Sequence, residues 1–545
     1  MKKIFICLFA VIFYISSASA SSESQAFAMA KNLDIFNSVF KELNLHYVDS
    51  IPIEKIVSAG INGMLQKLDP YTNYIPEESE KDFKFMTTGE YGGIGSLISY
   101  KDSMVYISEI YEGKPANKAG LLPGDVFVTI DGKSTKGKST SDISSLLKGT
   151  PGTKVTVKVN RAGSKKTLKF EITREHIYIN PITYYGMLSD SIGYIRLSSF
   201  TDDCAEEVKK SMIDLKQKGM KSLILDLRGN PGGLLNEAIN ICNFFVPKGT
   251  TIVSTKGKLN KTGNVYKTAI NPIEPTLALV VMVDEGSASA SEIVSGALQD
   301  LDRAVIVGER TYGKGLVQST YPVAYNGQLK VTVAKYYTPS GRCIQAINYT
   351  LKDGESSKEI PDSLTNEFKT KNGRIVRDGR GISPDVKIEI EKYKTITYNL
   401  LLQNIIFDYV NEYYTNHPAL KSIDDYKFSD SDFADFKQFT INKKFKYELQ
   451  SESYLEDLIK TAKEEDRYES NKAIFDSLKT SLKHDINEDL DKAKDEITEF
   501  ISFEIIKRYF YHRGELIMML KSDKILDESL NILNDPKRYD SLLKP

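Results

Sequence analysis

The first part of the chain has the pattern of amphipathic helices. Between positions 24 and 68, apolar residues recur at steps of three and four, which places them on one face of a helix. Asp69 and Pro70 end this pattern, because a proline cannot continue a helix. We therefore predict an N-terminal helical region over residues 21–87.

The second part consists of short apolar stretches separated by glycine turns, which is typical of β-strands. Strands are predicted at residues 96–100, 105–110, 126–130 and 155–159, with one helix at 141–147. This pattern predicts a β-rich domain over residues 88–176.

Strands then alternate with helices over residues 177–391. Strands are predicted at 192–197, 223–227, 277–283 and 304–307, and helices at 204–218, 234–245 and 291–301. Short apolar runs joined through helices are typical of right-handed crossover units and of a largely parallel sheet that is buried on both faces. The third domain is therefore predicted to be an α/β crossover domain.

The last part, residues 392–545, has little glycine and many Lys, Asp, Glu and aromatic residues. Its apolar residues recur at helical spacing, so we predict helices with charged, solvated faces. It contains no catalytic motif, which favours a stabilising or covering helical domain over a dedicated recognition role. A chain of 545 residues is long enough for three or four domains of about 150 residues each.

Neither sign of charge dominates the chain. It contains 72 basic and 73 acidic residues, which gives a formal net charge of −1. Such a chain has no overall field that would attract nucleic acid or an anionic membrane. We therefore expect no nucleic-acid partner.

The chain begins with Lys2 and Lys3, an apolar run at 4–15 and the small residues Ala18 and Ala20, which together are typical of a secretory signal. A membrane anchor is the less favoured alternative, because a spanning helix needs about 20 apolar residues. No later run is long enough to span a bilayer. We predict a signal peptide at residues 1–20 and an exported protein without an integral membrane segment after cleavage, with the periplasm as the expected compartment.

After the predicted signal, the remaining cysteines are Cys204, Cys242 and Cys343. They are far apart, and neither a C-x-x-C spacing nor a nearby histidine cluster is present, so isolated thiols are favoured over a zinc site or a disulfide framework. One disulfide is compatible with export. No metal or cofactor is expected.

Small residues follow the predicted strand at 277–283, in the run GSASASEI at 286–293. The end of a strand before a helix is where α/β sheets bind ligands, and the first N–H groups of the helix can face an oxygen that becomes negative. One of these serines could act as a nucleophile. The alternative is that Ser287, Ser289 and Ser291 only cap the helix and leave room for packing.

A serine nucleophile needs a base, and none of the five histidines follows such a strand: His46, His176, His417, His484 and His512. Lys314, however, lies between Gly313 and Gly315, on a turn after the strand at 304–307. A lysine can act as a base where burial favours its neutral form. A phosphate-binding loop is disfavoured, because the pattern G-x-x-x-x-G-K-[ST] is not matched.

A third glycine turn follows the strand at 223–227, in the run LDLRGNPGG at 225–233. Gly232 or Gly233 can present a backbone N–H there without a side chain in the way. Together with the N–H of Ala290, it would complete an oxyanion hole, in which each donor lowers the barrier by about 3–4 kcal/mol.

These three runs, in this order, resemble the signatures of the C-terminal processing peptidases, also called tail-specific proteases. That family consists of serine/lysine endopeptidases with a PDZ domain, and the resemblance implies a serine protease core of the crotonase/ClpP-like type. By residue-to-residue match, it implies that Ser289 is the nucleophile, Lys314 its general base and Gln318 the residue that orients Lys314. It also implies supporting roles for Glu292, Asp300 and Thr311.

The β-rich domain adds a second resemblance. EYGGIGSLI at 90–98 resembles the carboxylate-binding loop of a PDZ domain, and PANKAGLLPGD at 115–125 resembles a later turn of the same module. Glycines let successive N–H groups converge on a terminal carboxylate, while the following strand pairs with the peptide. The expected peptide-binding residues are Gly92, Gly93, Ile94, Gly95, Ser96, Leu97 and Ile98.

Together these features predict a multidomain α/β protein with an N-terminal helical segment, a PDZ domain, a serine protease core and a C-terminal helical domain. The predicted function is that of an exported serine endopeptidase that binds the C-terminal tails of protein or peptide substrates and cleaves them through an acyl-enzyme. Replacing Ser287 or Ser291 with alanine is expected to leave much of the activity. The motifs do not determine the oligomeric state, and a homo-oligomer is compatible with them.

Two alternatives belong to other classes of function. A peptide-binding scaffold or chaperone would use the PDZ domain without cleaving, and it would not need a lysine near Ser289. An acyl-transfer or hydratase enzyme could use the oxyanion glycines alone, but it would leave the carboxylate-binding loop unexplained.

Overall fold

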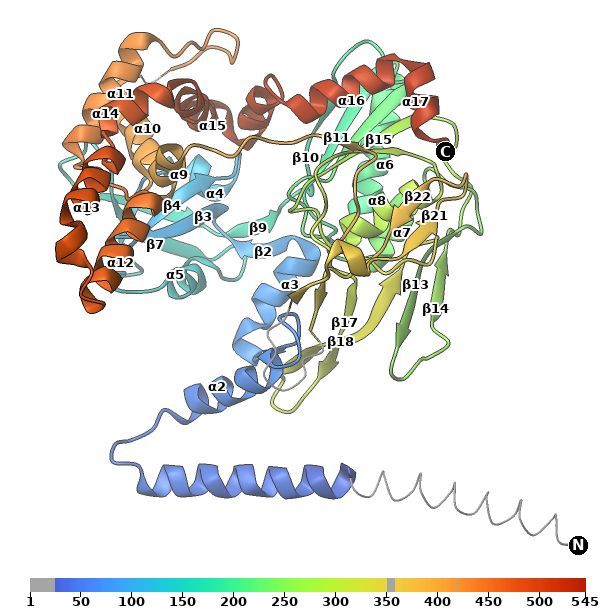
Figure 1. Ribbon diagram of the computed structural model, residues 1–545, viewed down its shortest axis with the longest axis horizontal. Helices are drawn as coiled ribbons and strands as arrows, with labels where there is room; N and C mark the ends of the chain where they lie inside the picture. Colours follow the sequence, from blue (N-terminus) through green and yellow to red (C-terminus); the bar gives the residue numbers. More distant parts are fainter. Residues whose placement is uncertain (1–24, 350–357, 418) are drawn as a thin grey trace, which may run out of the picture. The chain divides into compact units, whose positions relative to one another are not determined.

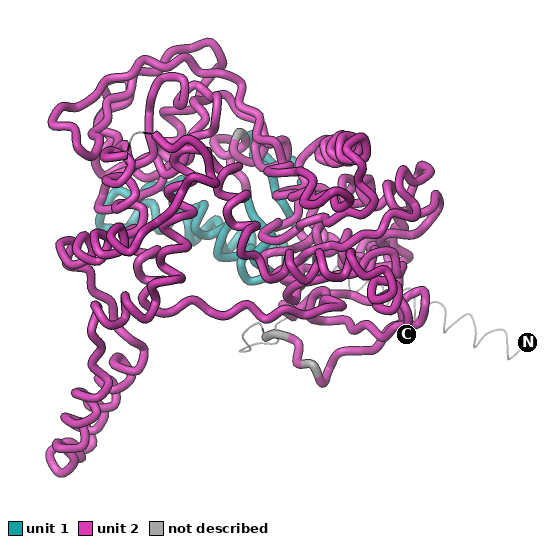
Figure 2. Tube along the Cα trace, turned by 90° about the horizontal axis from the view of Figure 1, so that it is seen from above, with its two compact units in different colours: residues 1–74, 320–331 teal, residues 75–319, 332–545 magenta. Residues whose placement is uncertain are grey.

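The computed structural model describes residues 25–349, 358–417 and 419–545 (Figure 1). The signal peptide predicted at residues 1–20 lies outside the described residues. Contacts divide the chain into two units, one of residues 1–74 and 320–331 and one of residues 75–319 and 332–545 (Figure 2).

The first unit is built on helices, as predicted. A helix at 25–46 is followed by α2 (Ile53–Gln66). Most apolar side chains of the helix at 25–46 remain exposed, among them Phe27 and Leu33, at 69% and 62%. The helical pattern of the sequence is therefore reproduced, while its apolar face stays largely uncovered within this unit.

The second unit begins with β1 (Asn73–Ile75), which starts in the first unit, followed by a short 3₁₀ turn at Glu77–Ser79 and α3 (Glu80–Thr88). The PDZ domain follows. Its antiparallel sheet has the order β3-β4-β5-β7-β8, with β6 beside β5. The elements are β3 (Ser96–Lys101), β4 (Met104–Ile110), α4 (Pro115–Lys118), β5 (Val126–Ile130), β6 (Lys133–Ser134), α5 (Thr140–Leu147), β7 (Lys154–Asn160) and β8 (Leu168–Thr173).

A separate ribbon pairs β2 (Glu90–Gly93) with β9 (Glu175–Tyr178) and closes the PDZ domain at its two chain ends. The four strands and the helix predicted here are present. β8 was not predicted, because most of its side chains are exposed or half-buried and only Ile172 is fully buried.

The predicted α/β crossover domain contains a six-stranded sheet of order β10-β11-β12-β15-β16-β23. All its pairings are parallel except that of β10 with β11. The strands are β10 (Ile182–Met187), β11 (Ile192–Leu197), β12 (Ser222–Asp226), β15 (Ala278–Val283), β16 (Val305–Gly308) and β23 (Val386–Lys387). The largely parallel sheet is as the alternating pattern predicted.

Alternate residues of these strands point to opposite faces of the sheet, and each face is covered. One face packs on α6 (Cys204–Gln217), α7 (Leu235–Cys242) and α8 (Ala290–Asp300). The other face packs on α16 (Lys524–Asn534) and α17 (Pro536–Leu542), through buried residues such as Ile525, Leu526 and Tyr539. The end of the chain therefore forms the second layer of the protease core (Figure 1).

Smaller β elements lie beside this core and were not predicted. β13 (Thr251–Gly257) pairs with both β14 (Asn264–Lys267) and β18 (Gln328–Tyr337). The remaining strands are β17 (Leu316–Pro322), β19 (Ile347–Asn348), β20 (Lys358–Glu359), β21 (Glu367–Lys369) and β22 (Ile375–Arg377), with a 3₁₀ turn at Asp362–Leu364.

The C-terminal region is helical, as predicted. Besides α16 and α17 it contains α9 (Thr395–Leu402), α10 (Ile405–Asn416), α11 (Asp430–Asn442), α12 (Gln450–Glu464), α13 (Tyr468–Leu482), α14 (Ile486–Lys492) and α15 (Lys494–Met519). α15 is broken at Phe510 and Tyr511, where the backbone leaves the helical conformation. No helix in the described part of the chain is long and apolar enough to span a membrane.

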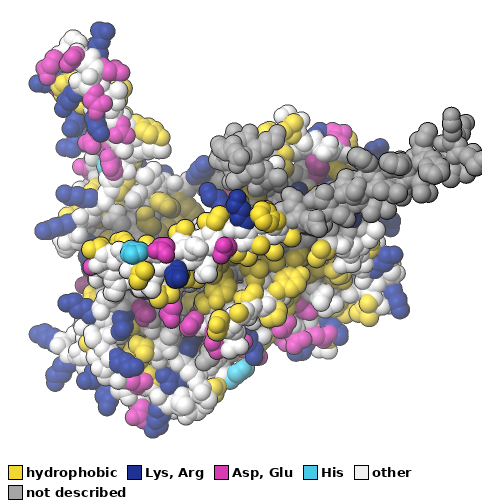
Figure 3. All heavy atoms as spheres, turned by 90° about the horizontal axis from the view of Figure 1, so that it is seen from below, with side chains coloured by type: hydrophobic (Ala, Val, Ile, Leu, Met, Phe, Trp, Pro, Cys, Tyr) yellow, Lys and Arg dark blue, Asp and Glu magenta, His cyan; other side chains and the backbone are white. Residues whose placement is uncertain are grey.

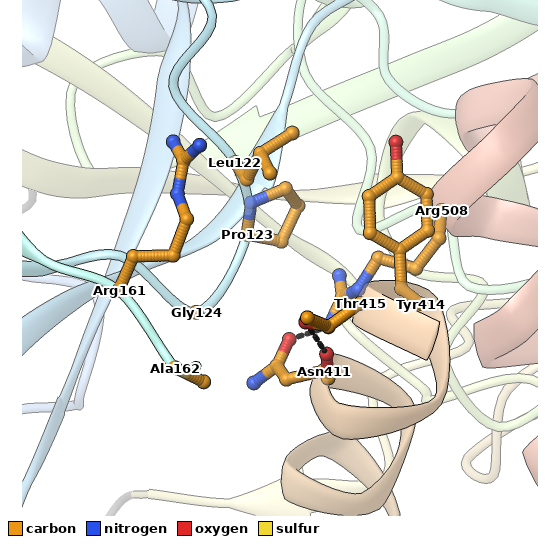
Figure 4. A pocket seen from close by; sticks show the side chains of 9 residues that line it. All are labelled: Leu122, Pro123, Gly124, Arg161, Ala162, Asn411, Tyr414, Thr415 and Arg508. Carbon is orange, nitrogen blue, oxygen red and sulfur yellow. Dashed lines mark hydrogen bonds between the residues drawn. The ribbon is translucent and has the colours of Figure 1, made fainter. Parts of the chain in front are cut away.

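The helical region contacts the PDZ domain through α10 and α15. Lys101 of β3 pairs with Asp408 of α10 at 2.9 Å. Figure 4 shows Asn411 and Arg508 of the helices near Pro123 and Gly124 of a PDZ turn, around a cavity of about 30 Å³. The guanidinium of the buried Arg508 also donates to the side chain of the half-buried Asn411 at 2.8 Å, which joins α15 to α10 beside this turn.

Charged side chains of both signs are mixed on the face of the molecule drawn in Figure 3, and hydrophobic side chains form a band across its middle. The mixture of signs matches the formal net charge of −1. On this face, charge is distributed rather than concentrated.

Candidate active site

Ser289 lies on a strained turn between β15 and α8. Its backbone has φ 54° and ψ −108°, a conformation that residues with a side chain rarely adopt. Such strain costs about 1–3 kcal/mol and persists only where the surrounding structure holds it, which happens most often at functional sites. The side chain of Ser289 is half-exposed, so its hydroxyl can reach a substrate.

The buried carboxylate of Glu292 joins this turn to the loop that contains Lys314. Its Oε2 accepts hydrogen bonds from the backbone N–H groups of Ser289 (2.8 Å) and Lys314 (2.9 Å). Its Oε1 accepts from the hydroxyl of Thr311 (2.6 Å) and the N–H of Gly313 (2.7 Å). One side chain therefore fixes the separation between the two segments.

Burial raises the pKa of the Glu292 carboxyl above its usual value, and its hydrogen-bond donors act in the opposite direction. All of these donors direct a hydrogen at the carboxyl oxygens. Only the ionised carboxylate accepts every one of these bonds, because a protonated oxygen would lose an acceptor site. The geometry thus fits a charged Glu292.

The two glycines predicted for an oxyanion hole have different surroundings. The N–H of Gly232 donates to the side-chain oxygen of Asn230 at 2.9 Å. Gly233 forms a parallel bridge with Phe200, and among the described residues its N–H has no hydrogen-bond partner. The N–H of Gly232 is therefore already engaged within the turn, while that of Gly233 remains available.

Gly232 also lies directly against the turn of Ser289. A Cβ added to Gly232 would come within 2.8 Å of both the Ser289 Cβ and the Ala290 nitrogen, and its φ is +97°. Only glycine fits both the conformation and the close approach. The runs at 225–233 and 286–293 are thus in contact, as their positions at neighbouring strand ends predicted.

Hydroxyl groups and a shared carbonyl hold these two turns together. The hydroxyl of Ser287 donates to the Leu227 carbonyl at 2.8 Å. The carbonyl of Asn230 accepts from the N–H of Ala288 (3.0 Å) and from the hydroxyl of Ser291 (2.9 Å). Both serines are fully buried and link the two turns, so we expect their replacement to lower activity more than the sequence alone suggested.

Lys314 and Gln318 follow on the next segment. Lys314 is half-buried on the loop before β17, and Gln318 lies on β17 itself. The side-chain amide of Gln318 donates to the hydroxyl of Thr332 on β18 at 3.1 Å, which orients its side chain. The structure therefore brings the backbone of Lys314 to that of Ser289 through Glu292, with Gln318 four residues further along the chain.

Two further residues predicted to support the site lie at different distances from it. Thr311 is beside Glu292, and its hydroxyl also accepts from the N–H of Ile382 at 2.7 Å. Asp300 lies at the other end of α8, about 15 Å from Ala290 by the rise of a helix. It pairs with the buried guanidinium of Arg342 at 2.8 Å, so the structure does not bring it near Ser289.

The residues predicted to bind a carboxylate span the end of β2, the turn at 94–95 and the start of β3. Their carbonyls are turned toward the protein: those of Gly92, Ile94 and Gly95 accept backbone bonds of 3.0, 2.8 and 3.1 Å. Burial raises the pKa of the Tyr91 hydroxyl to about 12, and the backbone of Gly95 and Ser96 acts on this pKa in the opposite direction. The hydroxyl of Tyr91 therefore lies close to this loop.

The strand that follows this loop is at the edge of the PDZ sheet. β3 pairs with β4 on one side only, so its other edge offers backbone N–H and C=O groups to a peptide. Leu97 is exposed at 46%, while Ile98 packs against the PDZ core. The free edge of β3 therefore leaves room for an added strand.

Some residues of the site were not singled out in the sequence. Asn230 lies inside the run at 225–233. An asparagine before glycines often bonds to the backbone of its own turn, so the sequence could have indicated this contact. Tyr91 lies at the start of the PDZ motif, and the contact of its ring with Gly93 was not predicted. Tyr336, whose hydroxyl donates to the Ser289 carbonyl at 3.3 Å, had no signal in the sequence.

Comparison with known families agrees with this arrangement. The model "Peptidase family S41" matches residues 191–352, and the model "PDZ domain" matches residues 106–161. The model "Probable PDZ-protease, C-terminal helical domain" matches residues 396–533. These ranges fall within the domains predicted at 177–391, 88–176 and 392–545.

Among curated proteins, a carboxy-terminal-processing protease of Bartonella bacilliformis is 37% identical over 324 residues, which are 59% of this chain and 74% of the relative. A probable CtpA-like serine protease of Staphylococcus aureus is 33% identical over 367 residues, 67% of this chain and 66% of the relative. A solved structure of a photosystem II D1 C-terminal processing protease is 27% identical and covers 65% of this chain and 92% of its own, with a TM-score of 0.35.

The fold and these similarities define a serine protease with a PDZ domain and a C-terminal helical domain. The chain belongs to peptidase family S41. The family and the fold class predicted from the sequence are thus confirmed.

We predict that Ser291→Ala lowers kcat for a peptide substrate by up to about tenfold, because it removes a buried hydrogen bond of about 0.5–1.5 kcal/mol between the two turns. Ser295→Ala is the matched control, since its equally buried hydroxyl bonds only to the Ser291 carbonyl within α8, at 2.8 Å. Steady-state kinetics of both variants measures the difference. An unchanged kcat in Ser291→Ala would show that this hydrogen bond does not support catalysis.

Proposed function

We propose that this chain is an exported endopeptidase that binds the C-terminal tails of protein or peptide substrates and cleaves them with Ser289 as nucleophile and Lys314 as general base. The observation that carries the proposal is the buried carboxylate of Glu292, which joins the strained turn of Ser289 to the loop of Lys314. A peptide-binding scaffold would need neither the strain nor this link.

In the proposed reaction, the neutral amine of Lys314 takes the proton of the Ser289 hydroxyl. The Ser289 oxygen then attacks the carbonyl carbon of the scissile peptide bond, and the carbonyl electron pair moves to its oxygen. Collapse of this intermediate breaks the C–N bond, and Lys314 gives its proton to the leaving amine. A water molecule, deprotonated by Lys314, hydrolyses the resulting ester and regenerates Ser289.

The negative oxygen of the intermediate requires hydrogen-bond donors that are already in place. Ala290 is the first residue of α8, so its N–H has no acceptor within the helix. Of the two candidate glycines, Gly233 is favoured as the second donor, because Gly232 already donates to Asn230. Gly232 would then contribute through its lack of a side chain, which allows its turn to contact the turn of Ser289.

Tail recognition is proposed at the loop of residues 92–98. The hydroxyl of Tyr91 lies close to the backbone of Gly95 and Ser96. A terminal carboxylate would bind the amides of this loop, and the tail would extend β3 as an added strand. The relative from Bartonella bacilliformis is a carboxy-terminal-processing protease, which supports this specificity.

Export is proposed from the predicted signal at residues 1–20, with the periplasm as the site of action. The substrates would be exported proteins that expose a C-terminal tail. Gln318 would orient Lys314, and the side chain of Thr332 would in turn hold Gln318 in place.

Two replacements test the proposed chemistry. Ser289→Ala should abolish cleavage of an unfolded protein substrate, because the attacking oxygen is lost. Lys314→Arg should be nearly as inactive as Lys314→Ala, because a guanidinium does not lose its proton near neutral pH. Mass spectrometry of the fragments, normalised to folded protein by circular dichroism, measures both effects.

Ser295→Ala is again the control, since its hydroxyl is buried within α8 and is bonded only to its own helix. Near wild-type cleavage by Ser289→Ala would show that another group is the nucleophile. Substantial turnover by Lys314→Arg would show that the positive charge of Lys314, and not its basicity, is required.

Binding of tails is tested with the full-length Ser289→Ala chain, which should bind without cleaving. A peptide with an apolar C-terminus should bind about tenfold or more tightly as the free acid than as the amide, which corresponds to roughly 1.5–3 kcal/mol. Equal affinities of acid and amide in fluorescence anisotropy would contradict carboxylate recognition.

A further inference from the structure

The guanidinium of Arg228 is shared by two carboxylates from distant parts of the chain. Arg228 immediately precedes the glycine turn at 229–233, and its Nη2 lies 2.7 Å from Oδ2 of Asp226. Asp523, just before α16, contacts the same guanidinium with both oxygens, at 3.0 Å from Nη1 and 2.6 Å from Nη2. The side chains of Arg228 and Asp523 are each only 13% exposed, so this is a built, largely buried contact.

Of the two carboxylates that contact Arg228, that of Asp226 is the more deeply buried and is rigidly held. Asp226 is fully buried at the end of β12 and accepts from the hydroxyl of Tyr194 at 2.6 Å and from the N–H of Arg228 at 2.9 Å. Burial alone would raise the pKa of Asp226, but the charge of Arg228 lowers it below the usual value. Asp226 therefore fixes one side of the guanidinium, and Asp523 fixes the other.

Asp523 is itself fixed by the packing of α16. Its Oδ1 accepts from the N–H groups of Ile525 and Leu526, each at 3.0 Å, and so caps the helix. Ile525 and Leu526 are buried against the core sheet. The carboxylate is therefore a rigid anchor, although it comes from the C-terminal helical region.

The turn after Arg228 is held at its other side by the strand end that leads to Ser289. Asp284 accepts from the N–H of Gly229 at 2.8 Å and from the N–H of Gly286 at 3.0 Å. The glycine turn is therefore held by Asp284 on one side and by the Arg228–Asp523 pair on the other. A shift of the guanidinium would move the start of the turn that contains Gly232 and Gly233.

We propose that Asp523 is a positioning residue for the reaction, which holds Arg228 and thereby the glycine turn that supplies an N–H to the oxyanion. This role rests on the proposed function of Ser289 and of that turn. It assigns to the helical region an indirect part in catalysis, besides its role as the second layer of the core.

Asp523→Asn is the variant of choice, because asparagine caps a helix about as well as aspartate but lacks the charge that pairs with Arg228. Asp535→Asn is the matched control: Asp535 caps α17 in the same way, with bonds of 3.1 Å from the N–H groups of Lys537 and Arg538, and is exposed. The substrate is a short amidated peptide, so that binding of a C-terminal carboxylate does not affect the measured kcat and KM.

We expect Asp523→Asn to lower kcat about tenfold, because a charge-assisted bidentate contact is lost, while KM changes less than about twofold. Asp535→Asn should keep the kcat of the wild type, and both variants should melt at similar temperatures. In an Arg228→Lys background, which keeps a positive charge but cannot form the bidentate contact, Asp523→Asn should add little further loss.

A kcat in Asp523→Asn equal to that in Asp535→Asn would overturn the proposal, and so would equal, additive losses with and without Arg228→Lys. A loss of activity that merely follows a lower melting temperature would also overturn it in favour of a structural role. If Ser289→Ala is inactive while Asp523→Asn is fully active, only the role of Asp523 fails. Cleavage by Ser289→Ala would instead contradict the proposed function itself.

Discussion

The hydrogen bonds to the buried carboxylate of Glu292 are the constraint on which the rest of the site depends. β15 and β16 pair in parallel, with Val283 opposite Gly308, so the segments of Ser289 and Lys314 leave the sheet at the same edge. Sheet geometry alone brings them to the same region. Glu292 sets their separation, because it accepts from the backbone of both segments. An ionised carboxylate is costly to bury unless its oxygens are satisfied, and here the two segments satisfy them.

The C-terminal helices link the other domains to this site through one continuous stretch of chain. At the break in α15, the hydroxyl of Tyr511 accepts a hydrogen bond of 3.0 Å from the side chain of Asn117 in the PDZ domain. α15 ends at Met519, and Asp523 follows four residues later beside Arg228. The segment that contacts the PDZ domain therefore leads directly to the residue proposed to hold the glycine turn.

Much of the core could be predicted because its strands are buried on both faces. β12 and β15 appear in the sequence as unbroken apolar runs, and the turns after them contain glycines and small residues that a site at a sheet edge requires. The contact between the runs at 225–233 and 286–293 followed from the rule that ligands bind at the carboxyl ends of parallel strands. The strained serine and its partners thus lie where local sequence patterns pointed.

Other features depend on contacts that no local pattern encodes. Arg228 and Asp523 are 295 residues apart, and each alone is typical of a solvated surface charge. The pairing of these two residues is decided only by the tertiary structure. The choice between Gly232 and Gly233, in contrast, depended on Asn230, which lies two residues before Gly232 and was open to a local interpretation.

Replacement of Glu292 by glutamine tests the central role of this carboxylate most directly. The amide keeps the size of the side chain but presents N–H groups where donors already point, which leaves buried groups unpaired at about 1–3 kcal/mol each. Kinetics on a short amidated peptide, with the exposed Glu285→Gln of the same turn as control, should show a loss of kcat of at least about a hundredfold for Glu292→Gln alone. A Glu292→Gln enzyme with the kcat of the control would contradict the account, because the two segments would then keep their geometry without the charge.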